Sequence, residues 1–471
     1  MAVYRNFNET VFRLAAATLL LLSACSDSAK LPVSAGIGAN PQLPPPDNSL
    51  IPTVKVAPAK PWPGNAQPAG APGTTVATFA SDLDHPRWLY VLPNGDVLVA
   101  ETNAPKRPLR EELLGLKGKI MAFFMKKAGA AVPSADRITL LRDADGDGQA
   151  EVRSVFAANL TSPFGMVLVG NELFIANTDA LVKIAYQTGD VKASSAVTKV
   201  ADLPGGPLNH HWTKNVVASR DGSKLYVSVG SNSNAAEHGM QHEEGRAAIW
   251  EFDRTSGKGR VFASGLRNPV GMAWQGDRLW TSVNERDELG SDLVPDYMTS
   301  VQDGGFYGWP YSYYGQHVDK RVEPPKPDLV AKAIVPDYAL GSHTASLGLT
   351  SAEGNKLGGP FAAGGMFVGQ HGSWNRKPPS GYKVIYVPFA GDKASGAPID
   401  VLTGFLAPDG NAFGRPVGVA VDKQGALLVA DDVGNRIWRV SGQSSTAAGV
   451  SPSTAPAAAA PSAPAASQPT R

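Results

Sequence analysis

The sequence has one cysteine, almost no net charge and only one long apolar run, and each shortage excludes a class of protein. Lysine and arginine number 43 against 42 acidic residues, so no overall field attracts nucleic acid or an anionic membrane surface. The lone Cys25 excludes an intrachain disulfide framework and a C-x-x-C-H haem attachment motif. Stability must therefore come from a packed core, and any charge-based function must be local.

The apolar run lies near the N-terminus and is typical of an export signal. Residues 14–22 follow Arg5 and Arg13 and are too few to cross a bilayer permanently. The stretch LSAC, which ends at Cys25, resembles the lipobox of bacterial lipoproteins, in which the cysteine becomes the lipidated first residue. We expect residues 1–24 to be removed and Cys25 to anchor the protein on the periplasmic side, with Ser26 favouring the outer membrane. The lipid anchor would be the only contact with the membrane.

Two stretches without hydrophobic periodicity flank the central part of the chain. Residues 25–74 are rich in Pro, Ala, Gly and Asn, and residues 443–471 consist largely of Ala, Pro and Ser. Such compositions bury too little apolar surface to offset the entropy lost on ordering. We interpret residues 25–74 as a tether, residues 443–471 as a disordered tail, and residues 75–442 as the folded domain.

One pattern recurs six times in the folded domain: a polar opening, an apolar strand, a turn, a second apolar strand and a polar ending. The repeats open at His85, Ser162, His211, Arg267, Thr344 and Arg415. Repeated hairpins at this spacing are typical of a β-propeller. The sequence therefore predicts an all-β fold, a six-bladed β-propeller.

A short helical insertion, residues 106–129, interrupts the first blade. Its apolar residues have helical spacing over residues 110–129, and we expect this face to pack against the disc. They are Leu113, Leu116, Ile120, Phe123 and Phe124.

The propeller geometry brings the polar openings and endings to one rim, because the second strand of a hairpin returns to the face where the first began. The openings contribute His85, Ser162, His211, Arg267 with Asn268, His343 with Thr344, and Arg415. The endings contribute Glu101, Asn177, Ser231, Asn284 with Glu285, His371 and Asp432. Histidines, arginines and carboxylates that converge on one mouth suit a polar or anionic ligand.

Adjacent histidines, His210 and His211, precede a strand pair that needs neither of them for folding. A lone histidine at a strand start usually satisfies a backbone group, but in this ring we favour a functional His211 and a structural His210. For Arg267 and Asn268 the alternative is a turn before proline. For Arg376 and Lys377 it is a solvated basic turn.

The stretch DADGDGQAE carries the alternating carboxylates of a calcium loop at Asp143, Asp145 and Asp147. Position twelve of that loop is Ser154 rather than glutamate. A structural calcium site and a plain Asp-Gly turn are equal alternatives here.

Five stretches together resemble the soluble quinoprotein sugar dehydrogenases, which depend on pyrroloquinoline quinone (PQQ), and most closely their sorbosone dehydrogenase-like branch. These are NHHWTKNVVASRDGSKLYVSVGSNSN, ASGLRNPVGMAW, NERDELGSDLVPDYMTSVQDGGFYGWPY, GGMFVGQHGSWNR and GRPVGVAV. The resemblance implies a six-bladed propeller with PQQ and calcium as cofactors. It also implies oxidation of an aldose or sugar aldehyde by hydride transfer to the quinone, and an external electron acceptor, a quinone or a cytochrome.

The resemblance assigns roles to individual residues as well. It implies that His211 is the catalytic base and that Arg267 and Asn268 contact the cofactor and assist catalysis. It places backbone calcium ligands around Asn284, Glu285 and Arg286. Basic partners for the carboxylates of PQQ would be Arg415 and either Arg376 or Lys377. Glucose-oxidising members carry acidic residues where this chain has His210 and Ser231, so the resemblance does not identify the sugar.

Two other functions remain open at this point. A calcium-dependent lactonase would place Glu101, Asn177 and Asp432 around a central metal. A non-catalytic propeller would only display a binding surface. The basic residues at the rim favour an anionic cofactor over both.

Overall fold

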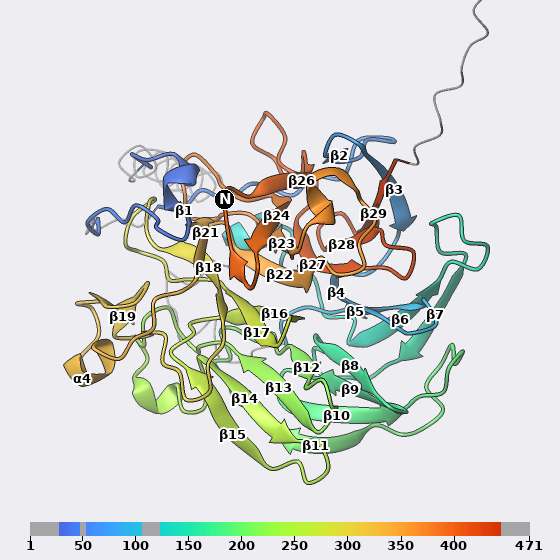
Figure 1. The fold of residues 1–471 in the computed structure, drawn as a ribbon, viewed down its shortest axis with the longest axis horizontal. Coiled ribbons are helices and arrows are strands. Elements are labelled where there is room, and N and C mark those ends of the chain that lie inside the picture. Colours follow the sequence, from blue (N-terminus) through green and yellow to red (C-terminus); the bar gives the residue numbers. More distant parts are fainter. Residues whose placement is uncertain (1–27, 48–52, 106–122, 444–471) are drawn as a thin grey trace, which may run out of the picture.

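A computed structural model describes residues 28–47, 53–105 and 123–443 and shows antiparallel blades arranged in a ring (Figure 1). The predicted six-bladed propeller is confirmed, and each blade begins just after one of the six predicted openings. Alternating apolar residues form the strands, and Asp-Gly or Asn-Gly pairs turn several hairpins, as at Asn94–Gly95 and Asp221–Gly222.

The first three blades each contain four consecutive strands. Blade one is β4 (Pro86–Val91), β5 (Val97–Glu101), β6 (Arg137–Arg142) and β7 (Val152–Ala157). Blade two is β8 (Met166–Val169), β9 (Glu172–Ala176), β10 (Ala180–Ala185) and β11 (Thr198–Asp202). Blade three is β12 (Val216–Ala218), β13 (Lys224–Val229), β14 (Ala248–Asp253) and β15 (Gly259–Ser264).

The other three blades include segments from distant parts of the chain. Blade four is β16 (Pro269–Gln275), β17 (Arg278–Val283), β18 (Pro295–Ser300), β21 (Tyr338–Ser342) and the added β1 (Ile37–Gly38). Blade five is β22 (Ser346–Ser351), β23 (Gly365–Gln370), β24 (Lys383–Ala390), β26 (Ile399–Thr403), the added β2 (Ala69–Gly70) and β25 (Lys393–Ala394). Blade six is β27 (Pro416–Val421), β28 (Leu427–Asp431), β29 (Arg436–Gly442) and β3 (Thr74–Ala80).

Short elements decorate the loops. They are η1 (Val33–Gly36), η2 (Met240–His242), β19 (Ser312–Tyr313), β20 (His317–Val318), α4 (Pro327–Val330) and η3 (Gly359–Ala362).

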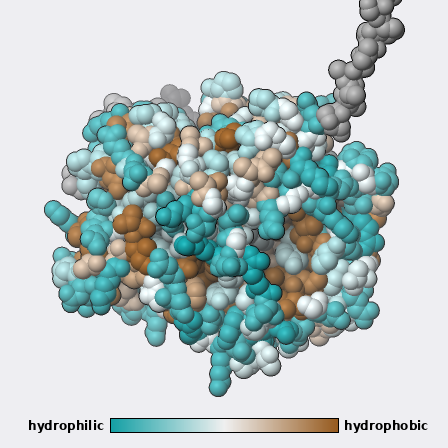
Figure 2. All heavy atoms as spheres, in the orientation of Figure 1, coloured by the Kyte–Doolittle hydropathy of each residue, from teal (hydrophilic) through white to brown (hydrophobic). Residues whose placement is uncertain are grey.

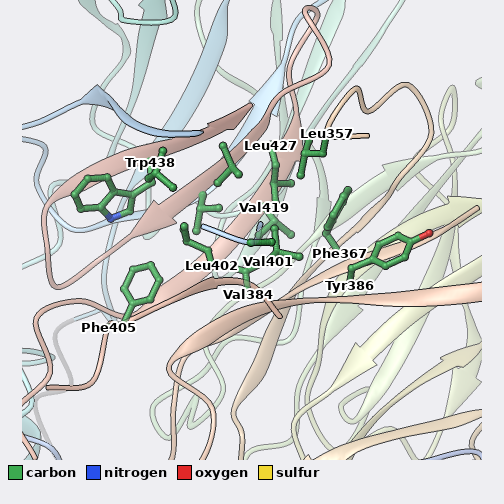
Figure 3. Packing of buried hydrophobic residues seen from close by; sticks show 14 of the residues in the cluster. Leu357, Phe367, Val384, Tyr386, Val401, Leu402, Phe405, Val419, Leu427 and Trp438 are labelled. Carbon is green, nitrogen blue, oxygen red and sulfur yellow. The ribbon is translucent and has the colours of Figure 1, made fainter. Parts of the chain in front are cut away.

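The core of the described protein consists of hydrophobic clusters between neighbouring blades, one at each of the six junctions around the ring. Figure 3 shows the junction of blades five and six, where Val384 and Leu402 meet Val419 and Trp438. The inner strands also pack closely, since a Cβ on Gly348 would overlap the carbonyl of Val417 on the next inner strand. On the face shown in Figure 2, hydrophobic residues form separate patches between hydrophilic ones.

The ring is closed by two strands from opposite ends of the folded domain. Strand β3 pairs antiparallel with β29, so that Thr78 lies opposite Trp438 and Val76 opposite Val440. The last blade is thereby completed by a strand that leads directly into the first blade, and this closes the ring.

The tether interpretation of residues 25–74 is wrong for the part that the structure describes. Strand β1 pairs with β21, β2 pairs with β26, and Trp62 is 7% exposed. The Trp62 indole packs against Phe405, Phe413 and Trp438, and its Nε1 donates to Asp431 Oδ2 at 3.0 Å. The segment needs no hydrophobic periodicity of its own, because it binds as an extended chain to loops and strand edges of the propeller.

Several predicted features lie outside the described residues: the export signal, Cys25, Leu113, Leu116, Ile120 and the tail beyond residue 443. Residues 123–127 form a helical end of the insertion between β5 and β6, but Phe123 is 63% exposed, so its side chain does not pack against the disc as expected. Within the described ranges, no helix is long and apolar enough to cross a bilayer.

Candidate active site

Two groups of polar side chains occupy the rim where the sequence predicted a site. We call the first the His211 cluster and the second the Asp432 cluster. The His211 cluster comprises His211, Ser231, Arg267, Asn284 and Glu285, and the Asp432 cluster comprises His85, Arg87, His371, Arg415 and Asp432.

His211 lies in the loop before β12 and is held on both its side chain and its backbone. Its Nδ1 is 2.9 Å from the Ser231 carbonyl oxygen and 3.0 Å from Ser231 Oγ. Its own carbonyl accepts hydrogen bonds from Lys214 Nζ at 3.2 Å and Arg246 Nη2 at 3.1 Å. A Cβ on Gly230 would lie 2.5 Å from His211 Cβ, so glycine is needed there for the close approach.

The electrostatic surroundings keep the His211 imidazole neutral. Burial lowers its pKa well below 6.5, and the positive charges of Arg267 and Arg246, together with His210, lower it further. The hydrogen bond that Nδ1 donates to the Ser231 carbonyl raises the pKa but does not compensate for these effects. A neutral imidazole with a free nitrogen is the form that acts as a general base.

Arg267 is 2% exposed and links the end of β13 to the loop after β17. Its Nη1 donates to the carbonyls of Glu285 at 2.7 Å and Asn284 at 3.2 Å, and its Nη2 donates to Asn234 Oδ1 at 3.0 Å. Asp287 Oδ2 lies 3.5 Å from Nη2. Burial alone would raise the pKa of Asp287, but His343 and Arg267 outweigh it and lower that pKa. Arg267 therefore sits in the site as a paired, immobile cation.

The backbone carbonyls to which the resemblance assigns calcium already face a cation. The Asn284 and Glu285 oxygens converge on the Arg267 guanidinium, where a hard metal ion would also find oxygen ligands. A calcium ion on both carbonyls would therefore require Arg267 to move. The Arg286 side chain points elsewhere, into a buried network with Glu285 and Asp319.

Asn268 is buried beside His211, and its Oδ1 has no hydrogen-bond partner among the described residues. Buried amide oxygens are rarely left unpartnered in the absence of a ligand or water. This oxygen is therefore left as an acceptor for a bound molecule or a water.

The Asp432 cluster places one carboxylate among three basic side chains. Asp432 Oδ2 lies 2.6 Å from Arg87 Nη1, 2.8 Å from His371 Nε2 and 3.6 Å from His85 Nε2. Burial would raise the pKa of Asp432, but these basic neighbours lower it, so the carboxylate stays ionised. Burial lowers the pKa of His85 to about 4 and also lowers that of His371, so both imidazoles are neutral at pH 7.

The basic residues predicted to bind an anionic cofactor differ in whether a carboxylate already pairs with them. Arg415 is 3% exposed, and its guanidinium donates to the carbonyls of His371 and Ala57 and lies 4.9 Å from the Tyr382 ring centre. No carboxylate pairs with Arg415 in the described part of the chain, and its Nε has no partner there. A buried arginine without a carboxylate suits the carboxylates of a quinone cofactor such as PQQ.

Arg376 and Lys377 fit that role less well. Arg376 lies 3.3 Å from Asp292 Oδ1 and donates to the carbonyls of Leu31 and Pro378, each at 2.9 Å. Its charge is thus already compensated. Lys377 is exposed, and its backbone carbonyl accepts from Ala29.

The carboxylates of Asp143, Asp145 and Asp147 do come together, with Glu151, in the turn between β6 and β7; one oxygen of each lies within 4.8 Å of the others. The three aspartates accept backbone N–H groups of the same loop, which the plain turn also explains. The calcium loop stays a prediction.

Sequence reasoning missed four residues of the site: Arg87, Lys214, Arg246 and Asp287. Arg87 lies on β4 two positions after His85, which precedes that strand, so its nearness in the sequence to a predicted opening was a signal that could have found it. Lys214 follows His211 by three positions, so its contact is local in the sequence. Arg246 lies beside His211 because β14, the strand that follows Arg246, pairs with β13 in three dimensions. No local pattern in the sequence indicates that contact.

Comparison with known proteins decides the family. The profile of the TrAA12-like family matches residues 137–302 and 330–443, which include His211, Arg267 and Arg415. The chain belongs to the TrAA12-like family. The family match thus covers all three predicted catalytic residues, His211, Arg267 and Asn268, and also Arg415.

A relative of this TrAA12-like chain agrees with the resemblance to the PQQ-dependent sugar dehydrogenases. A pyrroloquinoline quinone-dependent pyranose dehydrogenase of Coprinopsis cinerea is 26% identical over 332 residues, which are 56% of this chain and 45% of that enzyme. The chain thus spans less than half of that relative.

Solved structures support the fold. The Trichoderma reesei AA12 enzyme superposes with a TM-score of 0.64 at 17% identity, covering 81% of this chain and all of that one. The PQQ domain of the Coprinopsis cinerea pyranose dehydrogenase, in its holo form, superposes with a TM-score of 0.61 at 22% identity, covering 82% and 100%.

Proposed function

We propose that this TrAA12-like protein is a PQQ-dependent dehydrogenase that oxidises an aldose or a sorbosone-like sugar aldehyde at the mouth of its propeller. The observation that carries the proposal is His211, a half-buried, neutral histidine held beside Arg267 and the unpartnered oxygen of Asn268. The family and the quinone-dependent relative support the same chemistry.

PQQ, when bound, supplies a two-electron acceptor that takes up the hydride from the substrate carbon. His211 Nε2 removes the proton of the hydroxyl on that carbon, so that a carbonyl forms as the C–H bond breaks. The positive charge of Arg267 stabilises negative charge that develops beside it. Asn268 Oδ1 orients the substrate by accepting a second hydroxyl. An external quinone or cytochrome then removes the electrons.

The alternative lactonase would place Glu101, Asn177 and Asp432 around one metal ion. Both carboxylates are already paired in the described structure, although Asn177 Oδ1 has no partner there. Glu101 is 0% exposed, and both its oxygens are bonded to Arg137 within blade one. Asp432 is surrounded by basic groups. Neither side chain is available to a central metal ion.

One reconstitution experiment separates the candidate functions. Purified apo-protein is incubated with PQQ and calcium, and dye reduction by aldoses and sugar aldehydes is measured beside lactone hydrolysis. We expect dye reduction that depends on added PQQ. Hydrolysis of lactones without PQQ, or no turnover of any substrate despite PQQ binding, would overturn the proposal. Calcium at the rim and the lipid anchor at Cys25 are parts of the proposal that rest on the family resemblance and on the sequence.

Arg415→Met is expected to weaken PQQ binding about tenfold to a hundredfold, because a charge-assisted hydrogen bond contributes about 1.5–3 kcal/mol. Methionine keeps an apolar side chain over Tyr382. Titration of the apo-protein with PQQ measures the dissociation constant. Arg439→Met is the matched control, since Arg439 lies on the same blade and pairs with Asp422 in the turn at the opposite face. Equal dissociation constants for the two variants would exclude Arg415 from the cofactor site.

A further inference from the structure

The side chain that faces His211 Nδ1 is a serine. Ser231 follows β13 by two residues and is fully buried. Two of its oxygens approach Nδ1, the carbonyl at 2.9 Å and Oγ at 3.0 Å. The Oγ proton is already used, because Oγ donates to the Ser233 carbonyl at 2.6 Å. Both oxygens therefore present lone pairs to the imidazole.

Two acceptors facing one ring nitrogen determine the tautomer. Nδ1 must carry the proton of the neutral imidazole, which leaves the lone pair on Nε2. A hydroxyl alone could have faced either tautomer, since it can donate or accept. The bond from Ser231 Oγ to Ser233 removes that freedom.

We propose that Ser231 is a positioning residue, which holds His211 as the Nδ1–H tautomer through two uncharged acceptors and stands where a carboxylate would otherwise complete a charged pair. The inference rests on the proposed function, in which His211 Nε2 is the base. It adds that this base works without a negative partner.

The surroundings of His211 strengthen the contrast with a carboxylate-supported base. The basic and titratable groups around it are His210, Lys214, Arg246 and Arg267. The carboxylate of Glu243 accepts hydrogen bonds from Ser233 Oγ and from the Asn232 backbone N–H rather than from the imidazole. Within the described residues no carboxylate contacts the imidazole. The protonated form is therefore disfavoured, and the base stays active in acid, below pH 6.5.

The substitution Ser231→Asp places a negative charge beside the His211 imidazole. The substitution Ser231→Asn is the neutral control of the same size. An opposite charge in contact with an imidazole raises its pKa by about 1–3. In Ser231→Asp we expect a higher His211 pKa, so that the imidazole becomes protonated at a higher pH than in the wild type. Ser231→Asn should keep a low pKa.

Nitrogen-15 NMR of the apo-protein measures the tautomer and the pKa of His211 without the cofactor. The variant His211→Ala assigns the resonances. We expect the Nδ1–H tautomer and a pKa below 6.5 in the wild type, and a raised pKa in Ser231→Asp alone. An Nε2–H tautomer in the wild type would overturn the proposal, as would equal shifts in both variants or no shift in either. Should Ser231→Asp fail to fold, the wild-type tautomer decides.

Stopped-flow reduction of bound PQQ by substrate gives the second readout. The acid limb of the pH profile should move to higher pH in Ser231→Asp and stay in place in Ser231→Asn. An unmoved limb in Ser231→Asp would overturn the role of Ser231. Failure of the proposed function is distinguishable, because it abolishes PQQ reduction at every pH but leaves the apo-protein NMR result intact.

Discussion

Replacement of His211 by alanine is expected to slow the reduction of bound PQQ by about 10² to 10⁴, the usual contribution of a positioned general base. The imidazole is held at Nδ1 by Ser231 and at its backbone by Lys214 and Arg246, so its Nε2 is fixed in place before substrate arrives. Stopped-flow mixing of PQQ-loaded protein with substrate reads the chemical step apart from the electron acceptor.

His210→Ala is the matched control, since the two rings lie only 4.6 Å apart. We expect His210→Ala to change the apparent substrate affinity while the rate of PQQ reduction stays within about tenfold. Titration with PQQ should show that both variants still bind it. A wild-type rate in His211→Ala, or equal losses in both variants, would contradict the assignment of His211 as the base.

Trp62→Ala is expected to lower the free energy of unfolding by about 3–5 kcal/mol, the usual loss for a large buried aromatic residue. Trp62 lies in the stretch that its composition marks as a tether, yet it is 7% exposed and contacts three aromatic rings of blades five and six. Urea unfolding followed by circular dichroism measures the change.

Lys60→Ala is the control for this segment. Lys60 makes an exposed ion pair with Asp409 at 3.0 Å, and such pairs contribute about 0–1 kcal/mol. Trp62→Phe keeps an aromatic ring but loses the donor to Asp431, so its loss should be intermediate. If Trp62→Ala were no less stable than Lys60→Ala, the N-terminal segment would contribute nothing to the propeller.

The propeller could be predicted because its signal is local and repeated. Each blade carries its own apolar alternation and turn, as in PVGVAVDKQGALLVAD, which forms β27 and β28. The N-terminal segment carries no such signal. Its contacts are single and distant: Trp62 and Asp431 are 369 positions apart. Composition alone therefore suggested disorder where the structure shows packing.

Part of the candidate site could likewise be predicted from the sequence, and part of it could not. His211, Arg267 and Asn268 were predicted from openings that the fold brings to one rim. The difference between Arg376 and Arg415 could not be predicted, because Arg376 is neutralised by Asp292, 84 positions away, and bound by Leu31, 345 positions away. Whether an arginine can pair with a bound ligand depends on such partners, and these partners are known only from the folded structure.

The pairing of β3 with β29 has a consequence for how the protein is made. Strand β3 is synthesised first and its partner β29 last, so the ring cannot close until nearly the whole domain has left the ribosome. Contacts of such long range form slowly because the chain must first close a very large loop.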